Sequence, residues 1–179
     1  MVEASPAASA VIVRVPVPAP VERIRRRWDY AARLGVPSHV TVLFPFFGPD
    51  DLDRAVRREL AAIATRHRPF RVRFERVGRW PSVAFLAPEP SEPFARLTRD
   101  VVERFPDYPP YEGAHAEVVP HLTVAENPNA PLDEIAGAVE AALPFEHLVT
   151  SLAVLIETAD GRWHGHWRLP LGGSKGLTR

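Results

Sequence analysis

Apolar and polar residues alternate along several short stretches of the chain. Alternation at every second position predicts strands that bury one face. Such stretches occur at residues 11–17, 71–77, 82–88, 148–157 and 162–172, and two more lie at 38–44 and 120–126. Short turns such as GRWP, at 78–81, and Asp160-Gly161 separate neighbouring strands. Seven strands are therefore expected.

Apolar residues three and four positions apart predict amphipathic helices between these strands. The clearest helix is expected at 50–67, where Leu52, Val56, Leu60 and Ile63 share one face and Asp50 is suited to cap the first turn. Further helices are expected at 21–35, 94–105 and 131–143. Strands and helices of these lengths predict an α+β fold.

A short motif occurs twice, because residues 38–44 read SHVTVLF and residues 120–126 read PHLTVAE. A Val-Pro pair precedes each copy, and the order strand, helix, strand, turn, strand follows each one. Two such repeats would associate about a pseudo-two-fold axis, with the matching strands facing each other across a groove. We expect one bilobal domain at 11–172, with lobe one at about 11–90 and lobe two at about 91–172. Residues 1–10 and 173–179 are expected to be tails, the first of them flexible.

Composition narrows the classes of protein. The chain has 179 residues, of which 46% are apolar, and its formal net charge is zero. The first 80 residues carry a net charge of +7 and the rest −7, which suits either phosphate ligands or the mutual attraction of two lobes. The absence of cysteine excludes disulfides, thiolate nucleophiles and cysteine zinc sites. Without a signal-like start or a long apolar stretch, the expectation is a cytoplasmic monomer that does not contact membranes.

The repeated motif carries the chemistry. Residues i and i+2 of a strand share a face, so His39 lies beside Thr41, and His121 beside Thr123. One copy alone would be explained by a polar strand face, but two copies in matching contexts favour a functional pair. Cleavage of a phosphodiester requires one group that removes a proton and one that delivers a proton, and histidine can do either near neutral pH. Threonine hydroxyls can donate hydrogen bonds to phosphate oxygens, so no metal or other cofactor is needed.

These paired motifs, HVTV and HLTV, resemble the two signature motifs of the two-histidine (2H) phosphoesterases, which include the bacterial 2′-5′ RNA ligases and the cyclic nucleotide phosphodiesterases. The likeness extends from the first strand to Gly172. It implies two antiparallel sheets with flanking helices around a central cleft. It also implies opening of 2′,3′-cyclic or related cyclic phosphodiesters of nucleotides or RNA ends, in some members with 2′-5′ ligation. By this resemblance His39 and His121 are the catalytic acid-base pair, with their roles unassigned, and Thr41 and Thr123 bind the phosphate.

A metal-dependent hydrolase is an alternative. His164 and His166 are expected on one face of a strand, opposite Trp163 and Trp167, and metal sites use this spacing. His115 also lies six residues before His121. No carboxylate stands beside these histidines in a ligand pattern, so an exposed histidine pair is the simpler interpretation.

A non-catalytic nucleotide-binding or RNA-binding module is the second alternative. Tryptophan and tyrosine side chains can stack on bases, and the Arg-rich segments 23–28 and 71–74 could contact phosphates, although a solvated charged face explains these segments equally well. The presence of both motif histidines favours an enzyme. The aromatic candidates are Trp80, Tyr111, Trp163 and Trp167.

Overall fold

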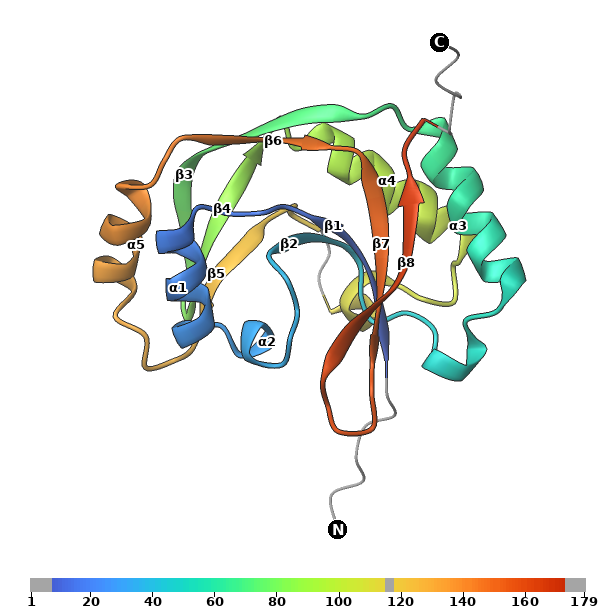
Figure 1. Cartoon of the computed structure of the whole chain (residues 1–179), viewed down its shortest axis with the longest axis horizontal. Coiled ribbons are helices and arrows are strands. Elements are labelled where there is room, and N and C mark those ends of the chain that lie inside the picture. Colours follow the sequence, from blue (N-terminus) through green and yellow to red (C-terminus); the bar gives the residue numbers. More distant parts are fainter. Residues whose placement is uncertain (1–7, 115–117, 173–179) are drawn as a thin grey trace.

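The computed structural model describes residues 8–114 and 118–172, which form two four-stranded antiparallel sheets with helices on their outer faces (Figure 1). The predicted α+β fold with two antiparallel sheets is confirmed. The first sheet has the order β2-β1-β7-β8, made of β2 (His39–Leu43), β1 (Ser9–Arg14), β7 (Ser151–Glu157) and β8 (Trp163–Pro170). The second has the order β5-β4-β3-β6, made of β5 (Leu122–Glu126), β4 (Val83–Glu89), β3 (Phe70–Trp80) and β6 (Phe145–Val149).

Each sheet has its own pair of helices. Helices α3 (Arg54–Arg66) and α4 (Glu92–Arg104) contact β8 and β2 of the first sheet, at the right of Figure 1. Helices α1 (Ala19–Trp28) and α5 (Leu132–Glu140) contact the second sheet, at the left. The short elements are α2 (Tyr30–Arg33), η1 (Pro49–Asp51) and η2 (Pro110–Gly113). None of the helices within the described residues is both long and apolar enough to cross a membrane.

Strand alternation separates the core from the candidate site. Val40 and Val42 of β2, and Leu122 and Val124 of β5, are fully or almost fully buried in one apolar core that extends under both sheets. Thr41 and Thr123, which lie between these apolar residues, are only half-buried. The motif histidines and threonines therefore lie on the faces that the helices leave uncovered.

Several predicted elements differ from the structure. The single strand expected at 148–157 is two strands, β6 and β7, which belong to different sheets, so the described residues form eight strands rather than seven. The segment 21–35 is not one helix, because Asp29 has an extended backbone (φ −107°, ψ 116°) that ends α1 and begins α2. The cap of α3 is Asp53 rather than Asp50: its carboxylate accepts hydrogen bonds of 2.8 Å from the N–H groups of Ala55 and Val56. A side-chain cap has to precede the first helical turn directly, and Asp50 lies in η1, which the pattern did not separate from the helix.

The expected boundary between lobes near residue 90 does not coincide with the division into sheets. Each sheet takes two strands from each half of the chain, because β1 pairs with β7 and β3 pairs with β6. The two repeats thus exchange strands, and both sheets depend on pairing between distant segments. At the start of the chain, β1 includes Ser9 and Ala10, which the sequence assigned to a tail. Residues 1–7 and 173–179 lie outside the described part.

A glycine in β3 makes room for an aromatic ring on the open face of the second sheet. Gly78 pairs with Phe85 of β4, and a Cβ atom on Gly78 would lie 2.3 Å from the Phe85 ring. We expect Gly78→Ala to displace that ring and to lower the free energy of unfolding by about 1–3 kcal/mol, measured by urea denaturation. Gly137→Ala in α5, where no atom lies within 4 Å of the new Cβ, should instead stabilise by about 0.5–1 kcal/mol. Equal effects of the two substitutions would contradict this packing.

Candidate functional site

The two motifs meet because β2 and β5 are edge strands of their sheets and contact one another (Figure 1). His39 is the first residue of β2, and His121 directly precedes β5. Both rings are half-buried, as are the hydroxyls of Thr41 and Thr123. The structure therefore brings together all four residues that the motif singled out, although 82 residues separate the copies.

Both imidazoles are held in the same way. The Nδ1 atom of His39 lies 2.7 Å from the carbonyl oxygen of Pro37, and Nδ1 of His121 lies 2.7 Å from that of Val119. A carbonyl oxygen can only accept, so each Nδ1 carries the proton and donates it. The Nε2 atom of each neutral ring is then unprotonated and can accept a proton.

The surroundings keep both rings neutral. Burial lowers the pKa of His39 from 6.5 to about 4, against the opposing hydrogen bond to Pro37, and the positive charges of Arg25 and His121 lower it further. Burial also lowers the pKa of His121, opposed by its bond to Val119 and by the charge of Glu126. The pKa of His39 is therefore lowered strongly and stays far below neutral pH, whereas the carboxylate of Glu126 partly offsets the lowering of the pKa of His121.

Tyr111, which lies outside the two motifs, also contacts the candidate site. The hydroxyl of Tyr111, in η2, is hydrogen-bonded to Thr41, and its N–H donates to the carbonyl of Phe44 at 2.7 Å. Burial raises the pKa of Tyr111, the bond to Thr41 opposes this, and the charge of Glu126 adds to the rise. The phenol therefore keeps its proton at neutral pH and can donate a hydrogen bond.

The backbone around Tyr111 is strained. Tyr111 and Glu112 both adopt left-handed conformations, with φ of 51° and 55°, which cost on the order of 1–3 kcal/mol each in non-glycine residues. Aromatic packing holds this loop, since the ring of Tyr108 lies 4.3 Å from that of Phe47 and 5.3 Å from that of Phe46. Strain of this kind concentrates at functional sites, which supports counting Tyr111 as a site residue.

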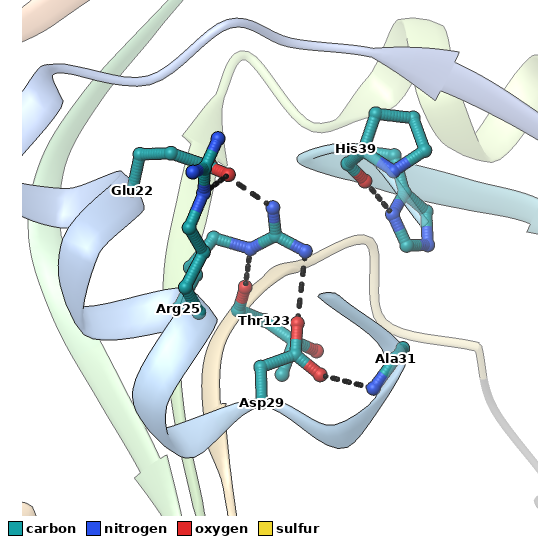
Figure 2. Close-up of polar contacts among 8 residues, drawn as sticks. Glu22, Arg25, Asp29, Ala31, His39 and Thr123 are labelled. Atoms are coloured by element: carbon teal, nitrogen blue, oxygen red, sulfur yellow. Dashed lines mark hydrogen bonds and ion pairs between the residues drawn. The ribbon is translucent and has the colours of Figure 1, made fainter. Parts of the chain in front are cut away.

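A buried arginine ties α1 to the second motif. Figure 2 shows the guanidinium of Arg25 between Glu22, Asp29 and the backbone carbonyl of Thr123. Its Nε donates to that carbonyl at 3.1 Å, and one terminal nitrogen donates to Asp29 at 2.8 Å. Arg25 and Asp29 are 1% and 2% exposed, so this is a buried ion pair. The same Asp29 carboxylate accepts the N–H of Ala31 at 3.0 Å and so caps α2.

Aromatic rings form one wall beside His121. The Trp80 ring stacks on Phe85 at 4.1 Å and meets the His121 ring edge-on at 4.8 Å. Trp80 is 39% exposed, whereas Phe85 is buried. A partly exposed indole ring therefore borders the imidazole.

The histidines of the metal alternative lie elsewhere. His164 and His166 are exposed on β8, and across residues 8–114 and 118–172 no three His, Cys, Asp or Glu side chains are grouped closely enough to hold a metal ion. His115 lies outside the described residues. The expectation that Trp163 and Trp167 share a face is wrong: a bulge at His166 shifts the register, so Trp163 packs on the smaller apolar cluster of the first sheet and Trp167 on the main core.

Sequence reasoning missed two residues of this site. Arg25 was considered only as part of the Arg-rich segment 23–28, either as a phosphate contact or as part of a solvated face. It falls on the same helical stripe as Val21, Ile24 and Trp28. A charged residue within an apolar stripe signals a buried ion pair. Tyr111 was considered only for stacking, and nothing in the local pattern shows that its hydroxyl reaches Thr41.

Comparison with known proteins gives the family of the chain. The family model described as the 2′-5′ RNA ligase superfamily matches residues 13–161. A Bacillus cytotoxicus protein named "putative phosphoesterase" is 28% identical over 155 residues, which cover 85% of this chain and 89% of that protein.

Solved structures share the fold. TT0787 of Thermus thermophilus has a TM-score of 0.62 at 21% identity, covering 93% of this chain and 99% of that one. Escherichia coli LigT, solved with 3′-AMP, has a TM-score of 0.56 at 16% identity, covering 93% and 99%. At these identities the likeness shows the fold alone, whereas the family model covers most of the chain. The chain belongs to the 2′-5′ RNA ligase superfamily.

Proposed function

We propose that this protein is a metal-independent phosphoesterase that opens 2′,3′-cyclic or related cyclic phosphodiesters of nucleotides or RNA ends. The observation that carries the proposal is the matched pair of imidazoles on neighbouring edge strands, each with Nδ1 bound to a carbonyl and Nε2 left for proton transfer. Membership of the 2′-5′ RNA ligase superfamily supports it. So does the 3′-AMP complex of LigT, because a nucleoside monophosphate is the type of product that ring opening releases.

The two histidines would divide the proton transfers. Nε2 of His39 takes a proton from water as the water oxygen bonds to phosphorus. The ester bond from phosphorus to one ribose oxygen then breaks, and that oxygen receives a proton from Nε2 of His121. His39 suits the base because its pKa is lowered to about 4, by burial first and then by Arg25 and His121. His121 must gain its proton when substrate binds. The negative charges of the phosphate and of Glu126 both favour this protonation.

Hydroxyl groups would hold the phosphate. Tyr111 and Thr41 are hydrogen-bonded to each other and each hydroxyl has one proton to donate, so whichever of them donates within the pair, the other keeps its proton for a non-bridging phosphate oxygen. The hydroxyl of Thr123 would also donate to the phosphate, from β5. The partly exposed ring of Trp80 could pack against the nucleoside. With an RNA 5′-hydroxyl in place of water, the same ring opening would bond the 5′ oxygen to phosphorus and break the bond to the ribose 3′ oxygen, which takes the proton from His121. This leaves a 2′-5′ linkage, so the same residues could support ligation.

The first test removes each imidazole. His39→Ala and His121→Ala should each lower kcat/KM by about 10²- to 10⁴-fold, as expected for a general acid or base, while thermal unfolding shows an intact fold. The assay uses 2′,3′-cyclic mononucleotides and RNA ends with a terminal cyclic phosphate, with and without chelator. His164→Ala, at an exposed position, serves as the matched control and should keep full activity. Near-native rates for His39→Ala would exclude the assigned role, and loss of activity with chelator would favour a metal enzyme.

The second test is the pH dependence. The folded-state pKa of each histidine lies below 6.5, so the active form, with His39 neutral and His121 protonated, is most populated between the two values. Because kcat/KM reports the free enzyme, we expect a bell-shaped pH profile. Activity should fall near pH 4 on the acid side, where His39 gains a proton, and should fall again above the pKa of His121, which lies below 6.5, where His121 loses its proton. Nitrogen-15 NMR should show both rings protonated at Nδ1, and denaturant should restore ordinary histidine titration. A titration of native His39 near 6.5 would contradict the proposed burial effect.

The third test addresses Tyr111. Tyr111→Phe keeps the ring and removes the hydroxyl, so kcat/KM should fall about 2- to 10-fold, the effect of one hydrogen bond. If Tyr111 acts through Thr41, the same change in a Thr41→Val background should cause little further loss. Tyr30→Phe, at a side chain that is 61% exposed, is the control and should have no effect. Independent, multiplying losses in the double variant would show that the two hydroxyls do not act together.

A further inference from the structure

A cavity of about 710 Å³ adjoins the candidate site on the His39 side. Its walls come from the segment 14–38 and from the turn between β7 and β8. Four guanidinium groups and a single carboxylate line it. They belong to Arg14, Arg26, Arg33, Arg162 and Glu22.

The strand register places this cavity next to His39. Arg14 of β1 pairs directly with His39 of β2, so the two side chains leave the sheet on the same face, with Cβ atoms about 4.5–5.5 Å apart. Pro37, whose carbonyl accepts the hydrogen bond from His39, is also part of the cavity wall. A ligand whose reacting phosphate sits at His39 can therefore extend into the cavity.

The described side chains that line the cavity carry an excess of positive charge. Glu22 is shared between Arg25 at 3.3 Å and Arg26 at 3.4 Å. Within the described residues, Arg14, Arg33 and Arg162 form no ion pair of 4 Å or less. Arg33 lies over the ring of Tyr30 at 5.7 Å, and Arg162 interacts electrostatically with Asp160. None of the three guanidinium groups is held in a close ion pair with a described carboxylate, so they can still bind a ligand with negative charge.

The walls are fixed against each other. The N–H of Trp163 donates to the carbonyl of Leu34 at 2.9 Å, which joins the β7–β8 turn to the loop before β2. Gly35 has a φ of 99°, and a Cβ there would lie 3.0 Å from the Trp163 carbonyl oxygen, so only glycine suits this close approach. Arg33 and Arg162, which lie far apart in the sequence, therefore line the same cavity.

We propose that this cavity binds a second phosphate of the substrate, the one on the 5′ oxygen of the nucleoside whose cyclic phosphate reacts. This inference rests on the proposed function and names its preferred substrate class. Arginine binds phosphate through paired, charge-assisted hydrogen bonds. Such a 5′-phosphate occurs in a 5′-phosphorylated cyclic mononucleotide and at every RNA end longer than one nucleotide. Unphosphorylated cyclic nucleosides are then the poorer substrates.

The deciding experiment compares the binding of adenosine 3′-monophosphate and adenosine 3′,5′-bisphosphate by calorimetry. The unsubstituted protein should bind the bisphosphate about 10- to 100-fold more tightly, the range for hydrogen bonds to a charged group, and the difference should shrink with added salt. Arg33→Ala combined with Arg162→Ala should remove this difference and leave the affinity for the monophosphate unchanged. Arg54→Ala combined with Arg57→Ala, a matched loss of two exposed charges on α3, should preserve it.

Two binding results would overturn the proposal. The first is equal affinity of the unsubstituted protein for both nucleotides, and the second is an equal loss for both in the Arg33 and Arg162 variant. Because binding is measured without turnover, this decision stands even if no cyclic phosphodiester is cleaved, a result that would reject only the proposed reaction.

A kinetic experiment tests which group of the substrate the cavity recognises. It compares a cyclic mononucleotide, its 5′-phosphorylated form and a trinucleotide with a terminal cyclic phosphate. A gain in kcat/KM for both extended substrates, lost in the Arg33 and Arg162 variant, supports recognition of the phosphate. A gain for the trinucleotide alone would overturn the assignment, because it would trace the preference to the added nucleosides.

Discussion

The hydrogen bond from buried Arg25 to the carbonyl of Thr123 is the contact on which the candidate site depends. β5 is an edge strand, and among the described residues its outer backbone has only the single bridge from Glu126 to Asp29 in place of a neighbouring strand. A buried carbonyl without a donor is costly. The guanidinium needs Asp29 in turn, because an unpaired charge in the interior would destabilise the fold by several kcal/mol. Asp29 also begins α2, which leads into β2, so one ion pair fixes the second motif and the approach to the first.

The parts of this structure that depend on local periodicity could be predicted from sequence. Alternation identified the buried and uncovered faces of β2 and β5, and the repeated motif indicated that His39 and His121 belong together. Strand pairing could not be predicted, because β1 and β7 lie about 140 residues apart and no local pattern encodes their partnership. The bulge in β8 was equally hidden, since one extra residue at His166 reverses the face of every later side chain.

The missed site residues share a physical cause. Arg25 has the same local chemistry as the neighbouring Arg23, Arg26 and Arg27, and only its place on the helix directs it inward. Tyr111 reaches Thr41 through a loop whose left-handed backbone is held by distant aromatic packing. Both contributions are polar contacts between segments far apart in the chain. Such contacts follow from the assembled fold rather than from spacing within one element.

The duplicated strands supply like groups, and side chains that differ between the two repeats make the surroundings of those groups different. Each motif strand provides an imidazole with Nδ1 bound to a carbonyl two residues earlier, and a threonine two residues later. Helix α1 precedes the first motif and packs on β5, as α4 precedes the second motif and packs on β2. Of these two helices only α1 carries a buried arginine, Arg25, and its positive charge lowers the pKa of His39. The carboxylate of Glu126 lies on the side of His121. Acid-base catalysis by two identical groups requires that they hold protons unequally, and in this chain that inequality comes from side chains that differ between the two repeats.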